Sequence, residues 1–454
     1  MGGEWQRVAV SDIAEPVLGG TPAKAKPEYW EGGTIPWATA KDIASTNGRF
    51  IYGTEKRITW QGLANSAAKL LPLGTIVITA RGTVGAIARL GREMTFNQTC
   101  YGLVPRGDDI SADYLYYALN ATLAEARALT YGTVFETITK KTFDSWNIPL
   151  PPLTEQRCIA RILGTLDDKI ELNRRMNETL EAMAQALFKS WFVDFDPVVV
   201  NALKAGNPIP DKFADRAAHY RENPDRLGLP DHILHLFPDS FVDSELGPIP
   251  EGWEVKQLST LAELRVETVV PIRESEALWE HYSIPAFDEG KIPKYELGRD
   301  IKSGKYKVPV TAVLVSKLNP QFPRIWLPDV INKERAVCST EFMPFVPKQI
   351  KWRPLLYELM KSDIVQKKIR SAVTGSTGSR QRVKPKSVAS MDVVVAPRNV
   401  LDTFSDQMSS IHNRVLFNQR ESRTLSALRD TLLPKLISGE LRLSDVEKIL
   451  EDAL

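Results

Sequence analysis

Two segments of the chain carry mostly apolar residues at alternating steps of four and three positions, and we call these positions the seam. The first seam set is Ile159, Leu163, Leu166, Ile170, Asn173, Asn177, Leu180, Ala184, Leu187 and Trp191. The second is Phe404, Met408, Ile411, Val415, Asn418, Ser422, Leu425, Arg429, Leu432 and Leu436. A sustained seven-residue repeat is typical of a coiled coil. The pattern therefore predicts two long helices, each about 50 Å between its end seam residues.

The two seams also match in their polar positions, with an asparagine at the fifth place of each. If the helices pair antiparallel and in full register, Asn177 faces Asn418 and Asn173 faces Ser422. Such polar layers lower stability somewhat and fix register and orientation. The alternative is two separate amphipathic helices on separate domains, and the matching polar layer favours the pair.

A fainter repeat precedes each predicted helix. SWNIPLPPL (145–153) aligns with SMDVVVAPR (390–398), and FNQTCYGLVP (96–105) aligns with CSTEFMPFVP (338–347). GTIVITARG (74–82) aligns with VTAVLVSKL (310–318), so that Arg81 takes the place of Lys317. The order is therefore β-rich unit, long helix, β-rich unit, long helix, which predicts an α+β fold with an internal pseudo-two-fold repeat.

We expect five parts along the chain. A length of 454 residues favours several globular units rather than one. Several prolines between the halves exclude one long helix there, so we expect a partly helical connector. The expected parts are a first β-rich domain (1–150), a first long helix (151–195), a connector (196–247), a second β-rich domain (248–398) and a second long helix with a tail (399–454).

Composition excludes several classes of protein. A hydrophobic content of 43% and a charged content of 25% match folded globular chains. No apolar run approaches membrane-spanning length, and no secretory signal is evident, so we expect no membrane partner. Three scattered cysteines suit a reducing cytoplasm, and five unpaired histidines argue against a metal site. The net charge of +2 does not by itself indicate a nucleic-acid partner.

Asn319-Pro320-Gln321-Phe322 is similar to the Asn/Asp-Pro-Pro-Tyr/Phe tetrapeptide of adenine-N6 methyltransferases. Its third residue is Gln321 instead of proline, and we find no glycine-rich S-adenosylmethionine motif. A surface loop after a strand is the better interpretation.

A loose nuclease pattern also occurs, with Asp239 followed by Glu254 and Lys256, in which two carboxylates would hold Mg²⁺. The pattern is short, and Glu254 and Lys256 have their own place in the repeat. No GxxxxGK[S/T] phosphate loop occurs. We therefore expect no catalysis and no cofactor in this chain.

Several stretches carry a family resemblance. The segment PLPPLTEQRCIARILGTLDDKIELNRRMNETLEAMAQALFKSWF resembles the central conserved region of type I restriction–modification specificity subunits. FPDSFVDSELGPIPEGWE, SKLNPQFPRIW followed by CSTEF, GSTGSRQRV, and LRDTLLPKLISGEL resemble further signatures of that family.

The resemblance implies two target-recognition domains held apart by an antiparallel coiled coil of two long helices, in a prokaryotic cytoplasm. Each domain would read one half of a split site in double-stranded DNA, and the helices would set the gap. The helices would also dock methyltransferase subunits, and motor–nuclease subunits would join the complex. S-adenosylmethionine, ATP and Mg²⁺ would then belong to those partner subunits, and this chain would be non-catalytic.

Candidate DNA contacts lie in the predicted loops. Arginine and lysine read guanine, asparagine and glutamine read adenine, and the same residue types also contact phosphates. The second half offers Arg380, Gln381, Arg382 and Lys384 in one loop and Lys317, Asn319, Gln321 and Arg324 in another. The first half offers Arg81, Thr83, Asn97, Gln98 and Lys41. The structural alternatives are a solvated basic loop and a capped turn.

The two halves differ in one loop. The counterpart of GSTGSRQR is YGTVFETIT (131–139), which lacks both arginines, so a common use of this loop in the two domains stays open. Phe188, Trp191 and Phe192 near one helix end are candidates for an interface anchor or for core. The competing functional hypotheses are a methyltransferase or nuclease with fused recognition domains, and a coiled-coil interaction protein without a DNA role.

Overall fold

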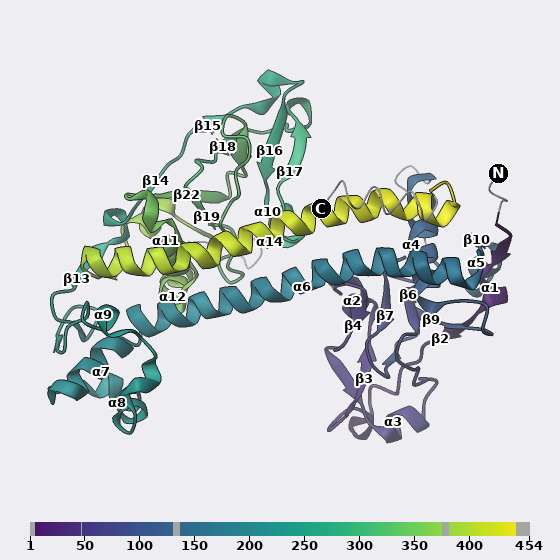
Figure 1. Cartoon of the computed structure of the whole chain (residues 1–454), viewed down its shortest axis with the longest axis horizontal. Coiled ribbons are helices and arrows are strands. Elements are labelled where there is room, and N and C mark those ends of the chain that lie inside the picture. The colour runs from purple at the N-terminus through teal and green to yellow at the C-terminus, as the bar shows by residue number, and fades with distance from the viewer. Residues whose placement is uncertain (1–4, 47, 130–136, 375–380, 442–454) are drawn as a thin grey trace. The chain divides into compact units, whose positions relative to one another are not determined.

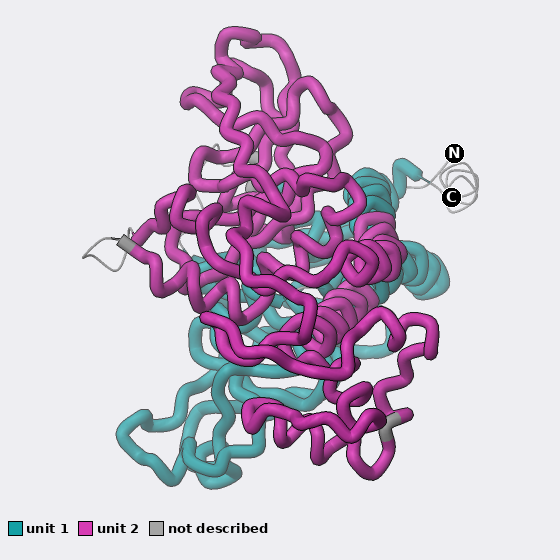
Figure 2. The backbone as a smooth tube through the Cα atoms, turned by 90° about the vertical axis from the view of Figure 1, so that its left-hand side faces the viewer, with its two compact units in different colours: residues 1–175, 418–454 teal, residues 176–417 magenta. Residues whose placement is uncertain are grey.

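The computed structural model describes residues 5–46, 48–129, 137–374 and 381–441. The chain forms two compact units, residues 1–175 with 418–454 (unit 1) and residues 176–417 (unit 2), shown in two colours in Figure 2. Two long helices, α6 (Leu153–Phe192) and α14 (Arg398–Ser438), each contribute one part to each unit.

The described residues of unit 1 form three sheets, one of which is the two-stranded β1–β10. Its described strands are β1 (Arg7–Ala9), β2 (Ala14–Leu18), β3 (Ile35–Ala38), β4 (Phe50–Ile51), β5 (Lys56–Ile58), β6 (Ile76–Thr79), β7 (Ile87–Leu90), β8 (Thr95–Phe96), β9 (Cys100–Pro105) and β10 (Asn147–Pro149). The larger sheet has the order β2-β9-β6-β7-β4 and the smaller has β5-β3-β8, while β1 pairs with β10. Its shorter helices are α1 (Val10–Ile13), α2 (Ala40–Ala44), α3 (Trp60–Ala64), α4 (Ala112–Leu129) and α5 (Lys140–Ser145).

The core of unit 1 lies between the larger sheet and the helices. All four residues of β6 are buried, as expected of a central strand covered on both faces. Ile76 and Ile78 of β6 belong to one apolar cluster with Tyr114 of α4, Leu163 of α6 and Leu432 of α14. The first β-rich unit and the adjoining parts of both long helices therefore fold around one core.

In unit 2 a helical connector follows α6 and leads into a second set of sheets. The connector helices are α7 (Asp196–Ala205), α8 (Ala214–Arg221) and α9 (Asp231–Leu234). The described strands are β11 (Phe241–Val242), β12 (Ile249–Pro250), β13 (Glu254–Gln257), β14 (Ala262–Leu264), β15 (Thr268–Val269), β16 (Leu278–Tyr282), β17 (Lys294–Leu297), β18 (Lys305–Lys307), β19 (Val313–Ser316), β20 (Ile325–Trp326), β21 (Ala336–Cys338), β22 (Phe342–Pro347), β23 (Val373–Thr374), β24 (Arg382–Val383) and β25 (Asp392–Val395).

The sheets of unit 2 repeat the connections of unit 1. Its helices outside the connector are α10 (Ile284–Asp288), α11 (Arg353–Lys361), α12 (Asp363–Ser371) and α13 (Pro385–Ala389). A four-stranded sheet has the order β14-β22-β19-β20, and a five-stranded sheet has β15-β18-β21-β16-β17. The pairs β3–β8 and β16–β21 are both parallel, whereas β6–β9 and β19–β22 are both antiparallel. The predicted internal repeat is thus present in the topology.

One predicted alignment within the repeat is wrong by one residue. Thr79 pairs with Cys100 in unit 1, and Ser316 pairs with Phe342 in unit 2. Ala80, and not Arg81, therefore occupies the place of Lys317. Strands that are buried on both faces have nearly continuous apolar sequences. Shifting the alignment of two such strands by one residue therefore leaves the apolar pattern unchanged.

The long helices pack together in both units (Figure 1). Every seam residue is buried or half-buried. In unit 1 the Asn173 amide donates to Ser422 Oγ at 3.3 Å, and Arg429 pairs with Asp167 at 2.7 Å. In unit 2 the rings of Phe188 and Phe404 lie 5.8 Å apart. Within each unit α6 and α14 are antiparallel to one another. The prediction of a helix pair is confirmed, and the alternative of two separate helices is not.

Of the two predicted polar pairs, the Asn173–Ser422 contact is present. Asn173 is fully buried and donates also to Glu421 at 2.6 Å. The Asn177 amide donates to the carbonyl of Val415 at 3.3 Å within unit 2. The facing of Asn177 and Asn418 would join the two units and stays a prediction. None of the described helices has an apolar stretch that would span a bilayer.

The first turn of α6 is fixed by a side chain that the pattern did not single out. Gln156 has no solvent exposure, accepts a hydrogen bond from Ser111 N at 2.9 Å, and donates to the carbonyls of Asp109 at 2.8 Å and Pro151 at 2.9 Å. The amide thus links the loop before α4 to the proline turn before α6. In the sequence, the only sign of this linking role is a polar residue on the buried face of the first turn of a helix.

Candidate nucleic-acid interface

Two loops predicted to contact DNA meet in unit 2. The first follows β19 and the second contains β24. Asn319 N donates to Gln381 O at 2.8 Å, Val383 N donates to Lys317 O at 3.1 Å, and Leu318 forms an isolated bridge with Arg382. Lys317, Asn319, Gln321, Gln381 and Arg382 therefore lie together although they come from segments about 60 positions apart.

The tetrapeptide 319–322 forms a β-turn. Phe322 N donates to Asn319 O at 2.9 Å, and Pro320 takes the second position, where its fixed φ is favourable. Asn319 has a left-handed φ of 47°, which asparagine tolerates better than most residues. The surface-loop interpretation is confirmed. The turn leaves Gln321 exposed and Phe322 66% exposed at its tip.

An acidic residue that sequence reasoning missed holds Arg382. Its guanidinium donates to Glu341 through Nη2 at 2.9 Å and through Nε at 3.1 Å. These hydrogen bonds raise the pKa of Arg382 above its ordinary value. Glu341 precedes β22 and so fixes the direction of an arginine in the neighbouring loop. Arg380 lies outside the described residues, and Lys384 is exposed at the start of α13.

Arg324 has a different environment from the other candidates. Its Nε and Nη2 donate to the two carboxylate oxygens of Asp288 at 2.7 and 2.8 Å. Only 16% of its side chain is exposed. The pairing attaches the end of the turn to α10 and favours a structural role for this arginine.

The first-half candidates lie around the matching end of β6. Arg81 and Thr83 are exposed in the loop after β6, and the Thr79 hydroxyl donates to the Thr83 carbonyl. Ile138 N donates to Ala80 O at 3.0 Å, in the way that Val383 donates to Lys317. The backbone therefore brings the same two segments together in each unit. Residues 130–136 of the second segment lie outside the described residues.

Asn97, Gln98 and Lys41 differ in how their side chains are engaged. Asn97 Oδ1 accepts from Thr99 N at 3.1 Å and from the Thr99 hydroxyl at 2.6 Å, which favours a turn-capping role. The side-chain Oε1 of Gln98 accepts a hydrogen bond from the Thr21 hydroxyl. Lys41 pairs with Glu55 at 3.2 Å, but both side chains are largely exposed, and such pairs are weak enough to exchange for a phosphate.

Comparisons with known proteins find similarity to specificity subunits of type I restriction enzymes. Residues 2–182 match the family model described as Type I restriction modification DNA specificity domain. The type I restriction enzyme MjaIX specificity subunit of Methanocaldococcus jannaschii is 26% identical over 98% of this chain and 95% of its own. The HindI specificity subunit of Haemophilus influenzae is 27% identical over 70% of this chain and 73% of its own.

This chain is similar to specificity subunits of type I restriction enzymes over most of its length. A solved structure of such a subunit has a similar fold. The S subunit of a type I restriction–modification system from M. genitalium matches 95% of this chain and 96% of its own, with a TM-score of 0.52 and 14% identity. At this level of identity the match supports the fold alone.

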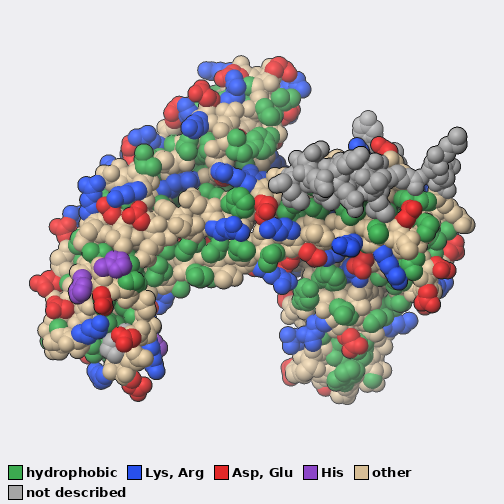
Figure 3. Space-filling view, in the orientation of Figure 1, with side chains coloured by type: hydrophobic (Ala, Val, Ile, Leu, Met, Phe, Trp, Pro, Cys, Tyr) green, Lys and Arg blue, Asp and Glu red, His purple; other side chains and the backbone are tan. Residues whose placement is uncertain are grey.

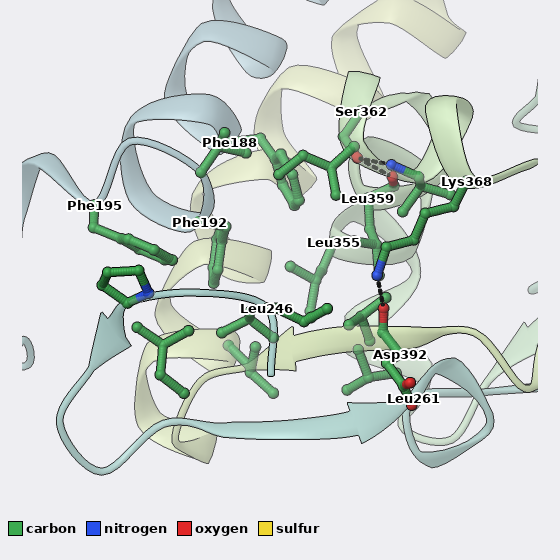
Figure 4. A pocket seen from close by; sticks show the side chains of 18 of the residues that line it. Phe188, Phe192, Phe195, Leu246, Leu261, Leu355, Leu359, Ser362, Lys368 and Asp392 are labelled. Atoms are coloured by element: carbon green, nitrogen blue, oxygen red, sulfur yellow. Dashed lines mark hydrogen bonds between the residues drawn. The ribbon is translucent and has the colours of Figure 1, made fainter. Parts of the chain in front are cut away.

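The aromatic residues at the end of α6 belong to the apolar core of unit 2. Phe188, Trp191 and Phe192 are 3%, 0% and 8% exposed, which supports the core alternative over an exposed interface anchor. Phe188 and Phe192 line an apolar pocket of about 280 Å³ together with Leu355 and Leu359 (Figure 4). None of the candidate DNA-contacting residues lines this pocket.

Charged side chains of both signs are mixed on the face of the molecule seen in Figure 3. Figure 3 shows lysine and arginine side chains interspersed with aspartate and glutamate on the visible face. Within the described ranges, no three His, Cys, Asp or Glu side chains come together as a metal site. Of the loose nuclease pattern, Glu254 pairs with Lys256 on β13, and β13 pairs with β25. Local pairing on a strand thus accounts for two members of that pattern.

Proposed function

We propose that this chain is the non-catalytic DNA-recognition subunit of a type I restriction–modification complex. The observation that carries the proposal is the meeting of segments 317–324 and 381–383 in unit 2. Amide and guanidinium groups, which can present donors and acceptors to base edges, come together there. The same backbone arrangement recurs beside β6 in unit 1, so the chain offers two such places.

Two recognition places on one chain fit a split DNA site. Each β-rich domain, 1–150 and 248–398, would read one half-site through its loops. Lys317, Lys384, Lys41 and Arg81 would supply phosphate or base contacts, and phosphate contacts make affinity fall steeply with salt. A coiled-coil protein without a DNA role would instead show salt-insensitive behaviour on a DNA column.

The long helices would set the gap between half-sites and dock the methyltransferase subunits. Their buried seams and the Asn173–Ser422 contact support an antiparallel register, and a spacer of constant length would require such a register. Motor–nuclease subunits would join the assembled complex. S-adenosylmethionine, ATP and Mg²⁺ would be held by those partners, in the cytoplasm of a prokaryotic cell.

The first test is to co-express this chain with a methyltransferase subunit from the same operon and to sequence the host DNA for modified bases. The proposal predicts a split, adenine-methylated motif that disappears when this chain is omitted. Methylation that persists without this chain, or no methylation with a demonstrably active partner, would overturn it. Methyl transfer by the purified chain alone would revive the fused-methyltransferase hypothesis.

A second test addresses the spacer. One heptad would be inserted into each long helix, after Arg175 and before Asn418, so that the seam continues unbroken. The added length of about 10 Å corresponds to about three base pairs, so the accepted gap should lengthen by that amount while both half-sites stay unchanged. Seven residues inserted into the connector, after Asn223, serve as the control and should leave the gap unaltered. Loss of half-site identity in the helix variant would contradict the spacer role.

A further inference from the structure

The turn 319–322 combines an exposed aromatic ring with an amide held by a neighbouring loop. Folding gains nothing from leaving Phe322 66% exposed, since burial of a phenylalanine is worth about 2 kcal/mol. A single exposed apolar residue is not by itself informative. Here, however, the ring adjoins Gln321, whose Nε2 donates to Gln381 Oε1 at 3.4 Å. The Phe322 ring and the Gln321 amide therefore project from the same turn, and the hydrogen bond to Gln381 already orients the amide.

The amide of Gln321 retains the groups that adenine needs. One of its two N–H bonds points to Gln381, which leaves a second N–H and the Oε1 acceptor on the exposed side. In the major groove adenine presents N7 as an acceptor and N6 as a donor, and glutamine matches this pair with two hydrogen bonds. Guanine presents two acceptors there, so it would leave the Oε1 of Gln321 without a donor.

The turn is fixed by backbone hydrogen bonds and by a side-chain pair just after it. Gln381 O accepts from Asn319 N at 2.8 Å, and Phe322 N closes the turn on Asn319 O at 2.9 Å. Beyond the turn, Arg324 is attached to Asp288 by two hydrogen bonds. A turn fixed at both ends loses little conformational freedom on binding, so its two tip side chains act as a preorganised pair.

We propose that this turn reads one A·T base pair in the second half-site. Gln321 takes the N6 and N7 edge of adenine, and the Phe322 ring contacts the 5-methyl group of the paired thymine in the major groove. Gln381 is the positioning residue, because it touches the Gln321 amide. The inference rests on the proposed DNA-recognition function and names the base pair that this loop selects.

The test uses the complete complex with its methyltransferase subunits and a duplex that carries the methylated motif. Each thymine of the second half-site is replaced in turn by uracil, which removes only the methyl group. At one position the wild-type complex should bind about fourfold more weakly, the value of one buried methyl-sized group. Phe322→Ala should bind the thymine duplex as weakly as the wild type binds the uracil duplex. It should show no further loss with uracil.

The glutamine is tested at the same base pair. Replacing its adenine by 7-deazaadenine removes N7 and should weaken wild-type binding about three- to tenfold, the value of one hydrogen bond. Gln321→Leu should be insensitive to that replacement. Gln381→Ala should retain part of the sensitivity, because it only loosens the Gln321 amide. Ile350→Ala, at an apolar residue of the same unit that is 76% exposed, is the control and should behave as wild type.

The outcomes separate this inference from the proposed function. If the complex selects no split site at all, the proposed function itself fails. If it selects a site but no thymine methyl matters, or Phe322→Ala remains sensitive to uracil, the base-pair assignment alone is wrong. If Phe322→Ala weakens binding to every sequence equally, the ring makes a non-specific contact and the assignment is again overturned.

Discussion

The clamp formed by Gln156 at the start of α6 provides a sharp test of how unit 1 is stabilised. Gln156→Met keeps the length and volume of the side chain but removes both the amide donors and the carbonyl acceptor. Three backbone groups would lose their partner, namely Ser111 N, Asp109 O and Pro151 O. The substitution therefore tests hydrogen bonding with little change in packing.

The expected magnitude follows from the burial of those three groups. Asp109 is exposed, so water can replace its lost partner at little cost. Pro151 is buried and Ser111 is half-buried, and an unsatisfied buried group costs about 1 to 3 kcal/mol. We therefore expect unit 1 to lose about 2 to 4 kcal/mol. Gln156 lies three residues before the first seam residue of α6, and Leu401 lies three residues before the first seam residue of α14. Leu401 is buried and apolar, so it cannot form such a clamp in unit 2.

Hydrogen exchange measured by mass spectrometry suits this prediction, because it reports each unit separately. Amides of α4 and of the first turns of α6 should exchange about 30-fold to several hundred-fold faster, which corresponds to the expected loss. Amides of β19 and β22 in unit 2 should be unchanged. Gln61→Met, at an exposed glutamine of α3 in the same unit, is the matched control. Exchange in Gln156→Met within threefold of wild type would refute the clamp.

Three further predictions concern binding, thiol reactivity and pH. Arg382→Ala should weaken binding to the second half-site about fivefold to a hundredfold, the range for one base-reading side chain, as measured by competition binding. In the isolated chain only Cys158 should react rapidly with iodoacetamide, because burial raises the pKa of Cys100 to about 12 and that of Cys338 further still. Burial also lowers the pKa of His281 below its ordinary value of 6.5, against the opposing effect of Glu296. The unfolded chain then binds the extra proton first, so unit 2 should lose stability as the pH falls below about 6.5.

Each of these predictions has a control and a contradicting result. For Arg382, binding to the first half-site should persist, and equal loss at both half-sites would point to misfolding. For the thiols, Cys158→Ser should abolish rapid labelling, and rapid labelling of Cys338 would contradict its burial. For His281, urea titrations at several pH values should show a weaker pH dependence in His281→Gln, whereas His232→Gln, at an exposed histidine, should keep it.

The helix pair was predictable because its signal is local and repeated. Each seam residue lies three or four positions from the next, so the apolar stripe can be read without knowing the partner. The polar members of the stripe then predicted the Asn173–Ser422 contact, which the structure confirms. The repeat of the β-rich units was readable for the same reason, since strand composition and flanking prolines recur in order.

Register within the strands was decided by tertiary structure. Residues 312–315 before and in β19 are all apolar, and every residue of β19 is buried because both faces of the strand are covered. A run without alternation contains no information about which residue faces which side. Hydrogen bonds to the neighbouring strand fix this choice. They show that Ala80 occupies the position equivalent to Lys317, which the alignment had given to Arg81.

The partners and exposure of each candidate side chain likewise could not be predicted from the sequence. Residue type alone does not distinguish Arg324, held by Asp288, from Arg382, held by Glu341 at a loop that faces solvent. Nor does it show that the turn with Gln321 meets Gln381. Local periodicity determined the elements of this protein. The contacts among its loops arise between residues far apart in the chain, so only the folded arrangement of the strands could bring them together.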